Sequence, residues 1–312
     1  MSYHSIHIKK PNRGHRMSNF SFSKVTIIES LKPTDFKSGT SLCESINGLR
    51  EDNPEAPLAE LETVQGCDGF LAKIRELTLS ARDNDEFPIL HIETHGWGDK
   101  SGLAFADGSS LGWDDLAQSL GLLNEATRFN LVVCVAACFG GHFVGSIKPT
   151  APAPCFALVG PTHTVLPDEL LRSFRDFYRA LLTTPTAPAA LQALLAHRLT
   201  VGGFLTTSVE DWFFKLADAY LRNDCTPERL KERAEKIIEQ LKRESKTVNS
   251  EQQAEIEKIG ETLAFGFLDR RFSEFFMIEE IPENADRFAA SLAKAKAQAT
   301  SFFNAQKPSA AA

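Results

Sequence analysis

Long hydrophobic runs are missing from this sequence. No apolar stretch approaches the roughly 20 residues that a helix needs to cross a bilayer, and the N-terminal residues lack the apolar segment of a signal peptide. These two absences predict a cytoplasmic protein that has no membrane partner.

An excess of positive charge is also missing. The chain of 312 residues carries 34 Lys and Arg against 41 Asp and Glu, a formal net charge of −7. Binding to phosphate backbones relies on clustered Lys and Arg, so no nucleic-acid partner is expected. The one basic stretch, residues 7–16, is interpreted as a solvated tail. With 43% hydrophobic and 24% charged residues, the composition is that of a globular protein.

Cysteines are few and scattered, which argues against a disulfide framework and for a reducing compartment. In such a compartment a thiol remains available as a nucleophile. The six cysteines are Cys43, Cys67, Cys134, Cys138, Cys155 and Cys225.

The chain divides by pattern into four parts: a flexible leader (1–22), a domain of alternating strands and helices (23–208), a helical region (209–305) and a disordered tail (306–312). Strands are predicted at 24–31, 57–64, 87–93, 129–137 and 154–160, with a hairpin over 102–113 around Asp107-Gly108. Helices are predicted at 41–49, 69–82, 114–125 and 168–182. The alternation predicts an α/β fold with a mostly parallel sheet between helices. A nucleotide-binding domain is the alternative, but no strand leads into a Gly-rich phosphate loop.

Four helices are predicted beyond residue 209, at 211–222, 227–244, 251–267 and 285–303. Their charge is dense but of both signs, which is typical of solvated helix faces. We interpret this α-helical C-terminal appendage as a regulatory or partner-binding region.

Two predicted strands end in residues that can carry chemistry. The run at 87–93 is followed by His95 and Gly96, and the run at 129–137 is followed by Cys138, Phe139 and two glycines. In parallel sheets reacting groups collect at the carboxyl ends of strands. A cysteine needs a neighbouring base because the thiolate is the nucleophile. The pattern therefore predicts His95 and Cys138 as catalytic residues, with the backbone N–H groups of Gly96 and Cys138 as an oxyanion hole.

Other candidates in the same runs have simpler interpretations. Cys134 and Cys155 lie inside apolar strands and are expected in the core, as is His91. The spacing of four between His91 and His95, and between Cys134 and Cys138, would suit a zinc site on helices. On strands, residues four apart lie more than ~13 Å apart, too far to share one metal. No metal and no cofactor is expected.

With these motifs the sequence resembles the caspase-like cysteine peptidases, most closely the CHAT-domain branch of that fold clan, which is widespread in bacteria. The resemblance rests on THG at 94–96, on AACFGG at 136–141, and on ALVGPTHTVLPDELLRSFRDFYRALL at 157–182. The His–Cys order, 43 residues apart, is close to the spacing of about 50 in caspases. The similarity covers about residues 24–200.

The resemblance implies a caspase-like peptidase domain and an endopeptidase that cleaves a protein substrate through an acyl-enzyme on Cys138, with His95 as acid and base and no strict third residue. Lys37 or Asp35, in the loop after the first strand, would line the substrate pocket and favour an acidic or a basic residue, respectively. His142 is a further candidate for this cleft. Ala136 stands where caspases carry Gln, which weakens any strict aspartate specificity.

By analogy with the clan, a regulatory protein partner and a role in bacterial defence or regulated cell death are expected. Two alternatives stay open: a catalytically inactive scaffold that binds partner proteins, and a different acyl-transfer enzyme that uses the same pair.

Overall fold

The computed structural model describes residues 15–17, 20–148, 150–184, 186–244 and 249–306. The chain forms two compact units. One contains the described residues up to Ile147 together with Ala153–Ser208, and the other contains Lys148–Pro152 and the described residues from Val209 onward. Within the part that the structure describes, every helix is too short or too polar to span a membrane.

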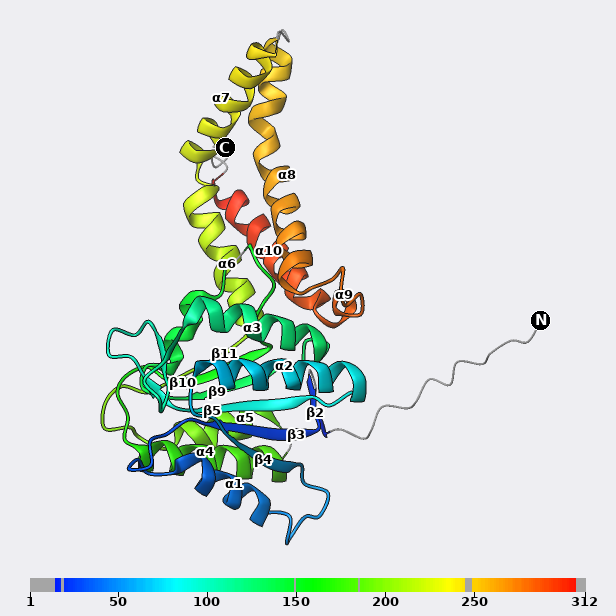
Figure 1. Cartoon of the computed structure of the whole chain (residues 1–312). Coiled ribbons are helices and arrows are strands. Elements are labelled where there is room, and N and C mark those ends of the chain that lie inside the picture. The colour runs from blue at the N-terminus through cyan, green and yellow to red at the C-terminus, as the bar shows by residue number, and fades with distance from the viewer. Residues whose placement is uncertain (1–14, 18–19, 149, 185, 245–248, 307–312) are drawn as a thin grey trace, which may run out of the picture. The chain divides into compact units, whose positions relative to one another are not determined.

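The first unit is built on a six-stranded sheet of order β11-β10-β9-β5-β3-β4 (Figure 1). All neighbouring strands are parallel except β10 and β11. This arrangement confirms the predicted α/β class. The strands are β3 (Lys24–Glu29), β4 (Leu58–Thr63), β5 (Pro88–Glu93), β9 (Val132–Ala136), β10 (Ala157–Pro161) and β11 (Phe204–Ser208).

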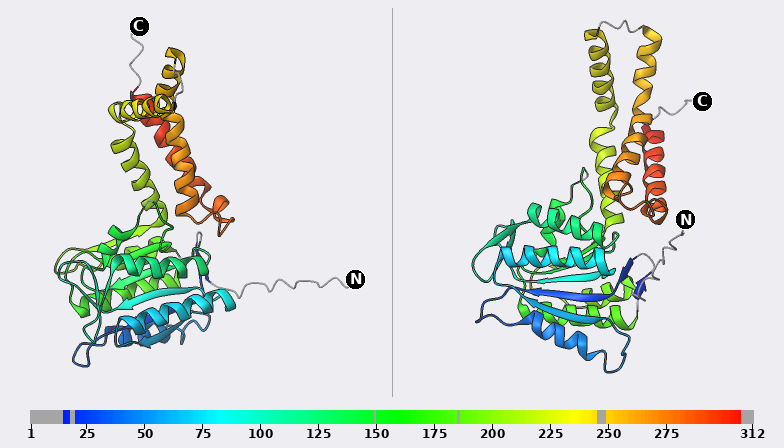
Figure 2. Two further views of the ribbon diagram at one scale, coloured as in Figure 1. Left: turned by 45° about the horizontal axis from the view of Figure 1, so that its top comes forward. Right: turned by 45° about the vertical axis from the view of Figure 1, so that its right-hand side comes forward.

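Helices cover both faces of this sheet, as the views in Figures 1 and 2 show. One face carries α2 (Cys67–Asn84) and α3 (Trp113–Ala126), and the other carries α1 (Ser38–Gly48), α4 (Pro167–Thr183) and α5 (Ala187–Leu195). Every residue of β5 and β9 is buried as a result. This explains why both strands are continuous apolar runs rather than alternating ones.

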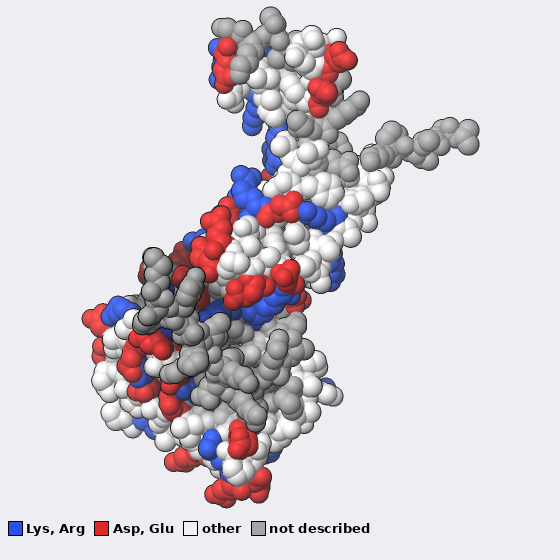
Figure 3. All heavy atoms as spheres, turned by 90° about the vertical axis from the view of Figure 1, so that its right-hand side faces the viewer, with Lys and Arg blue, Asp and Glu red and all other residues white. Residues whose placement is uncertain are grey.

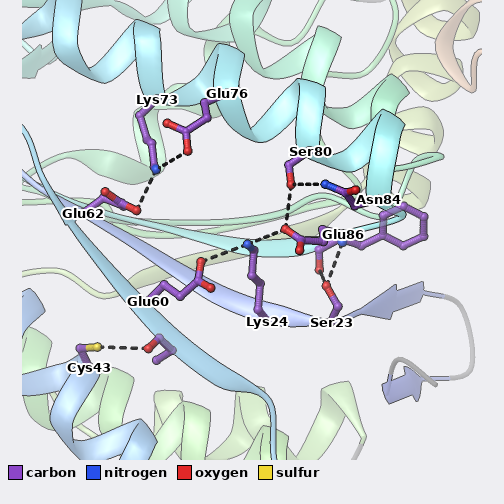
Figure 4. A network of polar contacts seen from close by, with 12 residues as sticks. Ser23, Lys24, Cys43, Glu60, Glu62, Lys73, Glu76, Ser80, Asn84 and Glu86 are labelled. Atoms are coloured by element: carbon purple, nitrogen blue, oxygen red, sulfur yellow. Dashed lines mark hydrogen bonds and ion pairs between the residues drawn. The ribbon is translucent and has the colours of Figure 1, made fainter. Parts of the chain in front are cut away.

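The edge strand β4 is held by two lysines that each lie between two carboxylates (Figure 4). Lys24 Nζ lies 3.0 Å from Glu60 and 2.7 Å from Glu86, and Lys73 Nζ contacts Glu62 at 2.7 Å and Glu76 at 2.9 Å. These ion pairs tie β4 to β3 and to α2. Charged side chains along an edge strand also disfavour pairing with another sheet.

A separate three-stranded antiparallel sheet follows β5. It consists of β6 (His95–Gly96), β7 (Gly102–Ala104) and β8 (Ser110–Gly112). The pairing of β7 with β8 confirms the predicted hairpin, with Gly108 at φ 90° in its turn. Since β6 begins two residues after β5 ends, this small sheet holds the segment that carries His95.

Three features differ from the sequence prediction. Part of the expected flexible leader is ordered: β1 (His15–Met17) and β2 (Phe20–Phe22) form a hairpin, Phe22 is buried, and the ring centroids of Phe20 and Phe156 lie 5.4 Å apart. Burial of Phe20 and Phe22 explains why this part of the expected leader is ordered. Residues 1–14 and the tail from 307 lie outside the described residues. Helix α5 and strand β11 are the other two features that were not predicted.

The second unit is helical, with α6 (Val209–Asp224), α7 (Pro227–Arg243), α8 (Ser250–Phe275), α9 (Asn284–Arg287) and α10 (Ala289–Gln306). Its core is aromatic: the ring centroids of Phe213 lie 5.8 Å from Phe272 and 5.2 Å from Phe276. Side chains of both signs are intermingled on the face of these helices that Figure 3 shows. Arg233 and Asp224, for example, form an ion pair at 3.3 Å.

Candidate active site

The two residues predicted to carry chemistry are brought to the same edge of the sheet. Strands β5 and β9 are parallel neighbours, and their last residues, Glu93 and Ala136, are register partners. His95 and Cys138 each follow their strand by two residues. The loops that carry them lie at the end of the sheet away from the β1–β2 hairpin, on the left in Figure 1. Strand pairing therefore brings together the two loops that carry His95 and Cys138.

The backbones of the two loops are in direct contact. A Cβ atom at Gly96 would lie 1.7 Å from the carbonyl oxygen of Cys138. Such a distance is impossible for any residue with a side chain, so only glycine permits this approach. The Gly96–Cys138 contact fixes the histidine-bearing loop against the cysteine-bearing loop.

Asp35 orients His95. The Nε2 atom of His95 lies 2.9 Å from Asp35 Oδ2, although the two residues are 60 positions apart. The hydrogen bond to His95 lowers the pKa of Asp35 below the ordinary aspartate value and so favours its ionised form. An ionised carboxylate only accepts hydrogen bonds, so Nε2 donates to it, and in the neutral imidazole the lone pair is then on Nδ1. A histidine in this tautomer can act as a base through Nδ1.

Cys138 is half-buried, with its Sγ 3.9 Å from the carbonyl oxygen of Val165. The next residue, Phe139, has φ 62°, an outlier for a bulky side chain that costs about 1–3 kcal/mol. A hydrogen bond from Phe139 N–H to the His163 carbonyl (3.1 Å) holds this conformation. Gly140 packs closely on β9, because a Cβ added there would lie 2.5 Å from the Val135 carbonyl oxygen. The sharp turn after β9 thus presents the thiol at the sheet edge.

The N–H of Gly96 points away from its partner strand. In antiparallel pairs, hydrogen-bonded and non-bonded positions alternate. Trp97 N–H bonds to the Gly102 carbonyl at 3.1 Å, so Gly96, which pairs with Leu103, occupies a non-bonded position. Its N–H is directed to the side opposite β7, as an oxyanion donor must be. Among the described residues, no backbone carbonyl accepts the N–H of Cys138.

The structure gives internal partners to the pocket residues suggested by the sequence. The Lys37 ammonium donates to the carbonyls of Leu31 (2.7 Å) and Lys32 (2.9 Å), so it closes its own loop. His142 Nε2 lies 3.1 Å from the Thr162 carbonyl and donates to it. Asp35, as described above, binds His95. All three side chains are engaged within the protein.

Sequence reasoning missed a buried polar network beneath the site. His91 Nδ1 lies 3.2 Å from the Tyr178 hydroxyl and His91 Nε2 lies 3.0 Å from Glu93 Oε1, while Ser38 Oγ donates to Glu93 Oε2 at 2.8 Å. Tyr178 also hydrogen-bonds the Cys134 thiol. The network joins β5, β9, α4 and the first turn of α1, and it anchors the strand end from which His95 extends.

A second carboxylate, Glu29, ends β3 beside Glu93 and accepts a hydrogen bond from Thr40 N at 3.0 Å. An anion at a helix N-terminus is stabilised by the unpaired N–H groups and the helix dipole. A glutamate as the last residue of two buried strands is the one sequence signal that could have indicated this arrangement.

The remaining cysteines are less suited to nucleophilic chemistry. Complete burial raises the pKa of Cys134 to about 12 and also raises that of Cys155. Burial likewise raises the pKa of Cys43 and of Cys67. No group of three or more His, Cys, Asp or Glu side chains in the described part of the chain is placed to hold a metal ion.

Comparison with protein-family models finds no matching family, and comparison with curated proteins finds no matching relative.

Proposed function

We propose that this protein is a cysteine endopeptidase with Cys138 as nucleophile, His95 as general acid and base, and Asp35 as the residue that orients His95. The observation that carries the proposal is the meeting of two loops at neighbouring strand ends. Gly96 packs on the Cys138 carbonyl there, while His95 is held by Asp35 at 2.9 Å.

In the first half of the reaction, Cys138 Sγ attacks the carbonyl carbon of the scissile peptide bond and His95 Nδ1 takes the thiol proton. The N–H groups of Gly96 and Cys138 stabilise the oxygen that becomes negatively charged, a contribution of about 3–4 kcal/mol per donor. His95 then passes its proton to the departing amine, the C–N bond breaks, and an acyl-enzyme remains on Cys138.

In the second half, His95 takes a proton from water, and the resulting hydroxide attacks the thioester. The C–S bond breaks, the peptide acid leaves, and the proton returns to Cys138. Throughout the cycle Asp35 stabilises the positive charge that His95 carries when protonated, as the acid of a catalytic triad does.

An inactive scaffold is the alternative function. The Asp35–His95 pair favours the enzyme, because a scaffold has no use for an oriented histidine whose second nitrogen is left as a base. The half-buried thiol beside it, unlike the buried Cys134, can be reached by a substrate.

The working context is part of the same proposal. We place the enzyme in the cytoplasm, where its thiol stays reduced. We assign the helical unit from Val209 onward to binding a regulatory protein partner, in line with its exposed faces of mixed charge.

The test combines a cysteine-directed acyl probe with a diverse peptide library. Wild-type protein should cleave a subset of peptides and be labelled at Cys138, whereas Cys138→Ala and His95→Ala should do neither. Cys43→Ala is the matched control, since Cys43 is also half-buried but lies on α1 against the Ala59 carbonyl. Absence of labelling at Cys138, even with the partner present, would contradict the peptidase proposal. Equal cleavage by Cys138→Ala would contradict the choice of nucleophile.

A further inference from the structure

Large apolar side chains are exposed in the loops around the candidate site. Among the described residues, nine large hydrophobic side chains are exposed, and five of them lie on helices or on a strand. The other four lie in loops of the first unit and are between 43% and 54% exposed. We call these four residues the apolar rim: Phe36, Trp97, Leu166 and Val201.

Two rim residues directly follow residues of the candidate site. Phe36 follows Asp35, which binds His95, and Trp97 follows Gly96, which packs on Cys138.

The other two rim residues adjoin the loops that face Cys138. Leu166 follows Val165, whose carbonyl lies 3.9 Å from Cys138 Sγ. Val201 precedes Gly202, whose added Cβ would lie 2.2 Å from the His163 ring, and His163 in turn accepts the Phe139 N–H. The exposed apolar surface of all four loops therefore borders the reactive pair.

The three charged or polar side chains that the sequence suggested for the pocket are already engaged, and the nearby exposed Lys100 lies over the ring of Phe139. The ammonium of Lys37 is bound by two backbone carbonyls, Asp35 is occupied by His95, and His142 is bound to the Thr162 carbonyl. Binding a charged substrate side chain through any of them would first break these contacts. Removal of apolar surface from water by a ligand, in contrast, stabilises the complex by about 25 cal/mol per Å² of surface.

We propose that the apolar rim binds large hydrophobic side chains of the substrate on both sides of the cleaved bond. The occupant is an extended protein segment rich in Leu, Phe and similar residues, not one selected by a single acidic or basic residue. This inference rests on the proposed peptidase function, since it assigns the rim's ligand to the substrate of Cys138. These exposed apolar side chains adjoin the loops of the candidate site, and exposed apolar surface of this kind can form a ligand-binding groove.

Binding can be measured apart from cleavage by using Cys138→Ala. Two fluorescein-labelled peptides of equal length and charge are compared by fluorescence polarisation, one with Leu and Phe at its central positions and one with Ser and Asn. We expect the apolar peptide to bind about tenfold more tightly, the effect of removing one or two good hydrophobic contacts. Equal affinity for the two peptides would overturn the inference.

Variants locate the binding surface. In the Cys138→Ala background, Trp97→Ser and Leu166→Ser should each reduce the affinity for the apolar peptide about fivefold to tenfold. Leu79→Ser on α2 and Leu122→Ser on α3 are matched controls, since both side chains are exposed but lie on helices away from the rim. Thermal unfolding checks that each variant folds. Equal losses in rim and control variants would also overturn the inference.

Cleavage of the same peptides by the wild-type protein separates the two proposals. Cleavage of both peptides at the same kcat/KM would support the peptidase proposal and contradict the proposed apolar preference. Tighter binding of the apolar peptide without any cleavage would contradict the peptidase proposal. The rim would then be the binding surface of a scaffold for apolar segments.

Discussion

Two histidine–cysteine pairs lie along β5 and β9, one on the strands in the interior of the sheet and one in the segments that follow them at the sheet edge. The inner pair, His91 and Cys134, are direct register partners and are fully buried. The outer pair, His95 and Cys138, lie four residues further along the chain in each case. There the histidine is half exposed and the cysteine half-buried. Residue type and spacing are identical, so only the surroundings differ.

Those surroundings decide the chemistry of each pair. In the interior, His91 has both ring nitrogens bonded, by Tyr178 and Glu93, and burial raises the pKa of Cys134 to about 12. At the edge, Asp35 binds Nε2 of His95, and among the described residues no internal partner hydrogen-bonds the other ring nitrogen. The inner pair is part of the fold's support, and the outer pair is the one that we propose as reactive.

The largest expected difference between the two pairs appears when Cys138 and Cys134 are each replaced by alanine. Cys138→Ala should lower kcat/KM by ~10³-fold or more, as removal of a nucleophile does, with unchanged thermal stability. Cys134→Ala should keep activity and lower the free energy of unfolding by about 1 kcal/mol, because it removes buried contacts. Steady-state kinetics and urea unfolding measure both. A folded but inactive Cys134→Ala protein would contradict the division of roles.

Gly96→Ala should separate the two outer residues without removing either. The added methyl would overlap the Cys138 carbonyl oxygen, so the histidine loop must shift. A displacement of about 1 Å in a catalytic group can cost ~100-fold in rate. Gly98→Ala in the same loop meets no atom within 4 Å and is the control. Similar activity of the two variants would show that the Gly96 contact does not position the site.

Tyr178→Phe tests the inner pair. Loss of the hydroxyl leaves Nδ1 of His91 buried without its partner, which should lower the free energy of unfolding by about 2 kcal/mol. The rate of Cys138 alkylation should stay close to that of wild type. Tyr220→Phe is the comparison, because the Tyr220 hydroxyl accepts a hydrogen bond at 3.3 Å from the partly exposed Arg233 in the helical unit, and its loss should matter less. An unchanged urea midpoint for Tyr178→Phe would contradict the supporting role.

Asp35→Asn should have a smaller effect on the outer pair, about a tenfold loss in kcat with little change in KM, the equivalent of about 1.4 kcal/mol. Asp176→Asn removes a comparable Asp–His pair, with His197 at 2.8 Å, on α4 and should leave activity unchanged.

The pH dependence of the Asp35–His95 contact has a definite sign. Hydrogen bonding to His95 lowers the pKa of Asp35 in the folded protein. The contact therefore contributes fully above the ordinary aspartate pKa and is lost as pH falls through the lowered value. The ratio of wild-type to Asp35→Asn activity should decline only in that acid range. A constant ratio down to strongly acid pH would contradict the assignment.

The sheet could be predicted from the sequence because its central strands are buried on both faces. Such strands are short apolar runs bounded by polar residues, so the predicted strand at 87–93 differs from β5 by one residue. The same reasoning located the strand ends and hence His95, Gly96 and Cys138. Helix α8 was predicted too short, at 251–267, because its last turns are stabilised by packing of Phe272 and Phe275 on Phe213, a tertiary effect.

Loop contacts could not be predicted in this way. Asp35 meets His95 across 60 residues through a loop that has no periodic pattern, and no local signal links the two. Strand β11 (FLTTS) is short and only half-buried, so its pairing with β10 determines its conformation. The hairpin of β1 and β2 depends on burial of Phe20 and Phe22 by residues far along the chain.

The central claim is that His95 makes Cys138 reactive, and alkylation by iodoacetamide, resolved cysteine by cysteine with mass spectrometry, tests it most directly. At neutral pH, Cys138 should be modified first. Cys43 and Cys67, whose pKa values are raised by burial, should follow only at more alkaline pH, and Cys134 only on unfolding. In His95→Ala, Cys138 should react as slowly as Cys43. A Cys138 that is modified at the same rate with and without His95 would contradict the account.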